Sequence, residues 1–189
     1  MFDVGETLVD ETRVWERAAD AAGVPRFTLM GVLGGLVAQG RPHGDVWRAL
    51  LVEPPLPIWS GVDLYPDALP CLARLRATGL VVGAVGNTPV EAEQMLRGHV
   101  DLVGSSARWG VEKPSGAFFE RIATETGLEP AAIAYVGDRV DNDVEPALAA
   151  GMVAVHIRRG PWGILHDPPP EATRICSLDE LPSALASSM

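Results

Sequence analysis

From residue 62 onward, short apolar runs alternate with segments whose apolar residues recur at helical spacing. The expected strands are residues 80–85, 100–105, 132–138 and 152–157. The expected helices are residues 67–79, 88–99, 114–127, 143–151 and 177–186. Strands that alternate with helices are joined by crossover connections, so this order predicts a parallel sheet with helices on both faces.

Residues 11–61 interrupt this alternation. They contain three helix-like stretches and a proline-rich return, EPPLPIWSG, but no run that is typical of a strand. We therefore expect two parts. One is an α/β core of residues 1–10 and 62–189, and the other is a helical insert of residues 11–61.

The aromatic residues of the insert, Trp15, Phe27 and Trp47, lie at spacings that favour packing between helices over contact with a ligand. Its basic residues Arg41, His43 and Arg48 are candidate contacts for an anion, but their context favours the solvated surface. The insert therefore says little about what the protein binds.

Composition and charge exclude several classes of protein. The net charge of −10 argues against a nucleic-acid partner held by general electrostatics. Cys71 and Cys176 match neither a disulfide framework nor a zinc site. We find no signal segment at the start and no apolar run of about 18 residues, so we expect a soluble cytoplasmic protein without a membrane span.

Ligands of open parallel sheets bind beyond the carboxyl ends of the strands, so the residues that follow each expected strand are the candidates for a site. Four such places carry polar groups. They are Asp3, then Gly86, Asn87 and Thr88, then Lys113, and finally Asp138, Asp141 and Asp143.

These residue types form a coherent chemical set. Carboxylates of Asp3, Asp138 and Asp143 suit Mg²⁺, which prefers hard oxygen ligands. A metal ion and Lys113 together would screen an anionic phosphoryl group while Asp3 attacks phosphorus. Each residue alone also fits a structural role as a turn, a helix cap or a surface lysine, but their order at successive strand ends favours a site.

The four places resemble the motifs of the haloacid dehalogenase-like hydrolase superfamily. FDVGETLVD resembles the first motif, VVGAVGN the second, VEKPS the third and VGDRVDND the fourth. The resemblance spans essentially the whole chain. It implies a three-layer, Rossmann-like α/β core, and the helical insert resembles the small C1-type cap that closes over the site in that family.

The resemblance also implies roles for individual residues. It implies a Mg²⁺-dependent phosphatase for a small phosphorylated molecule, with Asp3 as the nucleophile that forms an aspartyl-phosphate intermediate and Lys113 steadying the phosphate. The residues that would contact the substrate phosphate are Gly86, Asn87, Thr88 and Lys113. The residues that would hold Mg²⁺ are Asp3, Gly5 through its carbonyl, Asp138 and Asp143.

Gly5 departs from the family pattern, which places a second acid two residues after the nucleophile. That acid protonates the leaving group, and its loss costs about 10²–10⁴-fold in rate. Glu6 is the nearest carboxylate in the sequence, and a water, a cap residue or a substrate with a good leaving group are the other substitutes. We therefore expect weak phosphatase activity.

Two further departures concern the strands. Gly86 stands where the family usually has a Ser or Thr hydroxyl, so one hydrogen bond to the phosphate is lost. Only Met1 and Phe2 precede Asp3, whereas a strand usually runs about five residues. We therefore expect the natural chain to have a longer N-terminal segment.

Two alternative functions remain open at this point. Haloacid dehalogenases also lack the second acid, because a halide leaves without a proton, but they need no metal and would have no use for Asp138 and Asp143. A non-catalytic module that binds a phosphorylated ligand is the other alternative. Retention of Asp3 and Lys113 argues against it. No substrate identity or oligomeric state follows from the sequence.

Overall fold

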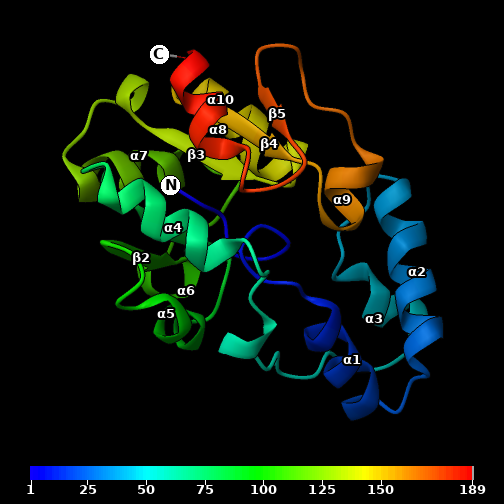
Figure 1. The fold of residues 1–189 in the computed structure, drawn as a ribbon. Helices are drawn as coiled ribbons and strands as arrows, with labels where there is room; N and C mark the ends of the chain where they lie inside the picture. Colours follow the sequence, from blue (N-terminus) through cyan, green and yellow to red (C-terminus); the bar gives the residue numbers. More distant parts are fainter. Residues whose placement is uncertain (189) are drawn as a thin grey trace.

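The computed structural model describes residues 1–188 and contains a parallel sheet at its centre (Figure 1). The named strands are β1 (Gly83–Gly86), β2 (Leu102–Ser105), β3 (Ala134–Gly137), β4 (Val153–Ile157) and β5 (Thr173–Ile175). β1 pairs with β2, and β3, β4 and β5 pair in that order, all in parallel. The expected parallel α/β fold is confirmed.

The first residues of the chain join the two groups of strands. Phe2 pairs in parallel with Ala84 of β1 on one side and with Val136 of β3 on the other. The N–H of Asp3 donates to the carbonyl of Val136 at 2.8 Å, and the N–H of Val85 donates to the carbonyl of Phe2 at 2.8 Å. Residues 1–2 thus form the central row of the sheet, between β1 and β3, and Asp3 lies at the carboxyl end of this row.

Helices cover both faces of the sheet. One face packs against α4 (Ala68–Ala77), α5 (Val90–Leu96) and α10 (Leu181–Ser188). The other face packs against α7 (Gly116–Thr126) and α8 (Glu145–Ala149). Successive side chains of β3 point to opposite faces of the sheet. Val136 packs in the apolar cluster under α4, α5 and α10, and Tyr135 packs in the cluster under α7 and α8.

The segment of residues 11–61 forms three helices (Figure 1), and these helices share a buried apolar cluster. They are α1 (Thr12–Ala21), α2 (Arg26–Ala38) and α3 (Asp45–Leu50). Their packing relies on Leu29, Leu33 and Val46, and Trp162 reaches this cluster from outside the segment. Phe27 is 91% exposed, so the expectation that it packs between helices is wrong. The division into core and cap stays a prediction.

Three elements lie where no helix or strand was expected. They are α6 (Ser106–Trp109), α9 (Gly160–Leu165) and β5, apart from two single-turn 3-10 helices at Gly61–Asp63 and Pro130–Ala132. β5 has three residues and forms by pairing with the preceding strand, so its own sequence carries too little pattern to detect. The helix expected over residues 143–151 begins with a wide turn at Val140–Val144 before α8.

Helix length and composition bear on the expected absence of a membrane span. Among residues 1–188, no single helix is both long and apolar enough to cross a bilayer. α1 and α2 pass that test only when taken as a pair, and they are bent by 119° relative to each other.

Asp67, just before α4, fastens distant parts of the chain together. Its Oδ2 accepts hydrogen bonds from Arg159 Nη2 at 2.5 Å, Ser177 Oγ at 3.0 Å and the N–H of Leu178 at 3.0 Å. The Arg159 guanidinium also donates to the carbonyl of Thr7 at 3.0 Å. Burial alone would raise the pKa of Asp67, but these donors outweigh it and hold the pKa below its usual value.

We predict that Asp67→Asn lowers the free energy of unfolding by roughly 1.5–3 kcal/mol, the range for hydrogen bonds to a charged group. Because the folded pKa is lowered, this contribution is present above about pH 4 and is lost as the pH falls through the folded value. Urea unfolding of both proteins between neutral and acidic pH measures it. Asp179→Asn, which removes an exposed pair with Arg74, is the control and should change little.

Candidate active site

Four charged side chains from separate segments meet at the carboxyl end of the sheet. Asp3 follows the central row, Lys113 precedes α7, Asp138 follows β3, and Asp143 lies in the wide turn before α8. Lys113 Nζ lies 2.6 Å from Asp3 Oδ1 and 2.5 Å from Asp143 Oδ1. Lys113 is 3% exposed, and it is the one lysine in the sequence.

The charges in this cluster do not balance. Burial by itself would lower the pKa of Lys113, but Asp143 and Asp3 raise it well above the usual value, so the ammonium stays charged. Burial raises the pKa of Asp138 well above its usual value, and the nearby charges of Asp143 and Asp3 raise it further. Three buried carboxyl groups thus face one ammonium, which favours an additional cation.

The carboxyl groups are arranged so that a cation could contact all three. Oxygens of Asp3, Asp138 and Asp143 lie within 4.8 Å of one another, and all three residues are buried. Asp138 Oδ2 is buried and has no hydrogen-bond partner among residues 1–188. A set of hard oxygen donors with an unpartnered member fits a hard divalent cation. Asp141, in contrast, is tied to Arg139 at 2.7 Å and lies outside the cluster.

The segment after β1 lies against Asp3 and Lys113. A Cβ on Gly86 would lie 2.7 Å from Asp3 Oδ1, so glycine leaves room for the Asp3 carboxylate. The Asn87 side chain accepts from the N–H of Lys113 at 2.8 Å and donates to its carbonyl at 2.9 Å. Asn87 therefore fixes the backbone that carries Lys113. Thr88 is buried and lines the cavity described next.

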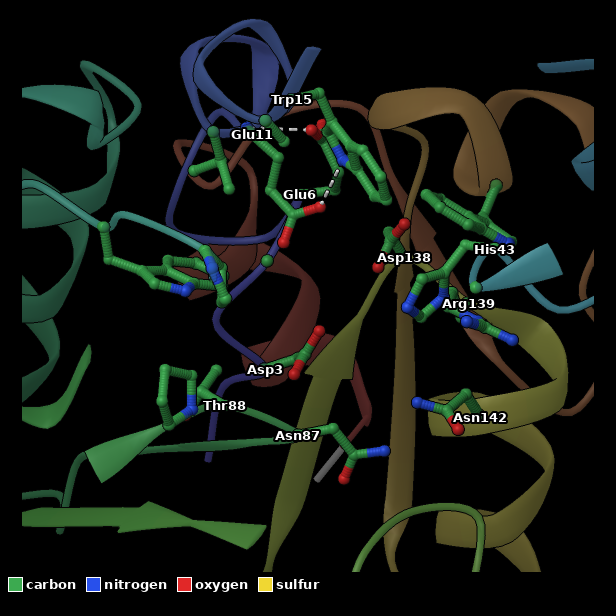
Figure 2. A pocket seen from close by; sticks show the side chains of 18 of the residues that line it. Asp3, Glu6, Glu11, Trp15, His43, Asn87, Thr88, Asp138, Arg139 and Asn142 are labelled. Atoms are coloured by element: carbon green, nitrogen blue, oxygen red, sulfur yellow. Dashed lines mark hydrogen bonds between the residues drawn. The ribbon is translucent and has the colours of Figure 1, made fainter. Parts of the chain in front are cut away.

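A cavity of about 520 Å³ opens above these groups (Figure 2), and its walls combine tryptophan and proline side chains with polar and charged ones. Trp15 and Trp47 stack at 6.1 Å and both line it. We had expected both tryptophans to be packing residues, and they serve the cavity wall as well. The His43 ring lies edge-on to Trp15 at 6.0 Å and to Trp162 at 5.9 Å.

Glu6, the carboxylate nearest to Gly5 in the sequence, is held away from the acidic cluster by hydrogen bonds. Its Oε2 accepts from Tyr65 Oη at 2.7 Å, and its Oε1 accepts from the N–H of Glu11 at 2.9 Å. The backbone of Glu6 has a φ of 51°, a conformation that few non-glycine residues adopt. Glu6 therefore shapes the loop between the central row and α1.

Glu11 is a cavity-lining residue that the sequence did not identify. Trp15 Nε1 donates to Glu11 Oε2 at 3.1 Å, four residues along α1. Burial raises the pKa of Glu11 to about 8, and the charge of Glu6 adds to this. No motif spacing marks Glu11, because the turn at Glu6 decides where α1 begins.

Comparison with known proteins identifies relatives of this chain. Residues 1–151 match the family model described as haloacid dehalogenase-like hydrolase. A glyceraldehyde 3-phosphate phosphatase of Methanocaldococcus jannaschii is 35% identical over 96% of this chain and 93% of that protein. A protein with the same description from Methanopyrus kandleri is 40% identical over 104 residues, which are 52% of this chain and 45% of that protein.

Solved structures add a comparison of fold. The L-2-haloacid dehalogenase of Xanthobacter autotrophicus has a TM-score of 0.70 with this chain at 17% identity and covers 100% of it and 98% of its own chain. At this identity the likeness shows the fold alone. The fold therefore does not separate attack on a phosphate ester from attack on a haloacid, and the residues of the site must do so.

We predict that Lys113→Met destabilises the protein by about 3–5 kcal/mol, because it leaves buried carboxylates without their cation. Urea unfolding at neutral pH, without divalent cations, measures the change. Arg121→Met removes an exposed cation from α7, whose partner is Glu125, and should cost less than about 1 kcal/mol. Equal effects of the two substitutions would contradict the prediction.

Proposed function

Since the chain belongs to the haloacid dehalogenase-like hydrolase family, we propose that it is a Mg²⁺-dependent phosphatase for a small phosphorylated molecule. The observation that carries this proposal is the buried cluster in which Asp3 and Asp143 share Lys113 beside the unpartnered Asp138. A dehalogenase has no need of such a metal-binding set. The full-length similarity to a glyceraldehyde 3-phosphate phosphatase supports the same choice.

In the proposed reaction, the Asp3 carboxylate attacks phosphorus and forms an aspartyl-phosphate, which water then hydrolyses. Lys113 holds Oδ1 of Asp3 at 2.6 Å, which orients the carboxylate and places a positive charge beside the incoming phosphate. Gly86, Thr88 and the backbone of Asn87 complete the phosphate site. Asn87 acts there mainly by holding the backbone of Lys113.

The residues that would hold Mg²⁺ are Asp3, Asp138 and Asp143, together with the carbonyl of Gly5, which the family resemblance implies. When bound, the ion would supply positive charge against the phosphate oxygens and relieve the mutual repulsion of the carboxylates. We further propose that helices α1, α2 and α3 form the cap. The cavity of about 520 Å³ between them and the cluster is large enough for a three-carbon phosphate, the class of substrate named for the relatives.

Hydrolysis of a panel of phosphate esters tests the proposal. The panel includes glyceraldehyde 3-phosphate and 4-nitrophenyl phosphate, with and without Mg²⁺. We expect Mg²⁺-dependent release of phosphate that Asp3→Asn abolishes, because the substitution removes the nucleophile. Asp167→Asn, at a side chain that is 96% exposed, is the control and should retain full activity. Halide release from a 2-haloacid, with no phosphate release, would instead identify a dehalogenase.

A binding module would give a third pattern. It would bind phosphate esters with unchanged affinity in wild type and Asp3→Asn, and neither protein would release phosphate. Isothermal titration with inorganic phosphate and Mg²⁺ distinguishes this outcome from an inactive preparation, because an inactive preparation would also fail to bind.

Thermal unfolding tests the proposed metal site without an activity assay. We expect Mg²⁺ to raise the Tm of the wild-type protein, by an amount equivalent to about 2.7 kcal/mol when its concentration is 100 times Kd. Asp138→Asn should lose this shift. Without metal the variant should be at least as stable as wild type, because it removes a buried carboxyl that lacks a partner. A Mg²⁺ shift of the same size in both proteins would place the ion elsewhere.

A further inference from the structure

Cleavage of a phosphate ester raises the question of where the leaving oxygen obtains its proton. An alkoxide is a poor leaving group, so the reaction of an alkyl phosphate needs a positioned acid. The carboxyl groups that line the cavity are Asp3, Glu6, Glu11 and Asp138. Asp3 and Asp138 belong to the acidic cluster, and Glu6 is fixed by Tyr65 and by the backbone of Glu11.

The position of Glu11 is set by the absence of a side chain at residue 5. A Cβ built on Gly5 would overlap Oε1 of Glu11 and lie 3.0 Å from its Cδ. The φ of Gly5 lies outside the left-handed region, so the backbone itself would accept another residue. The Glu11 carboxyl group therefore occupies the space that a side chain two residues after Asp3 would fill.

Two hydrogen bonds hold Glu11 in this place. The N–H of Glu11 donates to Glu6 Oε1, and Trp15 Nε1 donates to Oε2 of Glu11. Its other oxygen, Oε1, accepts no hydrogen bond from any residue in the described range 1–188. Figure 2 shows the side chain descending from the start of α1 toward Asp3, with a dashed line from its carboxylate to the indole of Trp15.

We propose that Glu11 is the general acid of this hydrolase and replaces, from a different part of the chain, the side chain that Gly5 lacks. The inference rests on the proposed phosphatase function. As the Asp3 oxygen bonds to phosphorus and the P–O bond to the leaving group breaks, Oε1 of Glu11 gives its proton to the leaving oxygen, which departs as the alcohol. The Glu11 carboxylate then takes a proton from the water that attacks the aspartyl-phosphate, and inorganic phosphate and the Asp3 carboxylate are released.

The acidic group comes from the first residue of the proposed cap, whereas the nucleophile comes from the core. Trp15, which also lines the substrate cavity, holds the Glu11 carboxyl group through its indole N–H.

Leaving-group dependence of kcat/KM tests the proposal, because kcat/KM includes the step in which the leaving group departs. Two substrates are compared. Glycerol 1-phosphate is an alkyl phosphate, and 4-nitrophenyl phosphate is an aryl phosphate whose leaving group needs no proton. Glu11→Gln keeps a side chain that can accept from Trp15 but cannot donate the same proton. We expect kcat/KM to fall about 10²–10⁴-fold for the alkyl ester and less than about tenfold for the aryl ester.

Glu16→Gln is the matched control, since Glu16 lies on the same helix and pairs with Arg26 at 3.3 Å outside the cavity. It should leave both rates unchanged. Equal losses for the alkyl and aryl esters in Glu11→Gln would show a merely structural role and overturn the proposal. A selective loss of alkyl ester hydrolysis in His43→Gln, with Glu11→Gln active, would assign the proton to His43 instead.

A rescue experiment tests the geometry directly. Glu11→Gly frees the space above Gly5 and leaves a residue that is tolerated at a helix N-cap. Combining it with Gly5→Asp returns a carboxyl group to that space, and we expect alkyl ester hydrolysis at least about tenfold above that of Glu11→Gln. Gly5→Asp alone places a second carboxyl group against that of Glu11 and should give no alkyl ester hydrolysis above that of wild type. A double variant that is folded by urea unfolding, yet no better than Glu11→Gln, would count against the shared position.

Wild type and Asp3→Asn, measured in the same assays, distinguish failure of the Glu11 proposal from failure of the phosphatase proposal. Full alkyl ester hydrolysis by Glu11→Gln, together with its loss in Asp3→Asn, would refute the role of Glu11 and leave the phosphatase function intact. Absence of hydrolysis of every ester by the wild-type protein would refute the phosphatase function, and the role of Glu11 with it.

Discussion

The rest of the site depends on the contact of Lys113 with two buried carboxylates. A buried ammonium is stable only beside opposite charge, and Asp3 and Asp143 supply it from segments that lie 110 and 30 residues away in the chain. The pairing brings together the start of the chain, the segment before α7 and the turn before α8. Because Asp138 remains without a partner, the same arrangement that stabilises the lysine leaves a place for a further cation.

The positions of these charged residues could largely be predicted from the sequence, because they follow from the topology of the sheet. Once residues 80–157 are interpreted as parallel strands with crossover helices, their carboxyl ends must share an edge, and Asp3, Lys113, Asp138 and Asp143 fall there. The structure brings these four side chains together, while their catalytic roles stay predictions. The sequence does not predict the local geometry of Asn87, whose side chain bonds to the Lys113 backbone.

What could not be predicted depends on contacts between segments without a repeating pattern. The location of Glu11 is decided by the turn at Glu6 and by the empty space above Gly5, and neither leaves a periodic signal. β5 exists because β4 offers it an edge. Trp15 and Trp47 were assigned to packing on helical spacing, and spacing cannot reveal that one side of such a ring faces a cavity.

The scarcity of lysine has a consequence beyond the chemistry of the site. Lys113 is the one lysine of the sequence, and its side chain is buried. The folded chain therefore presents no lysine ε-amine to solvent. Acylating reagents therefore find this amine only when the segment before α7 opens. The rate at which Lys113 is acylated would therefore measure how often this segment opens and exposes the acidic cluster.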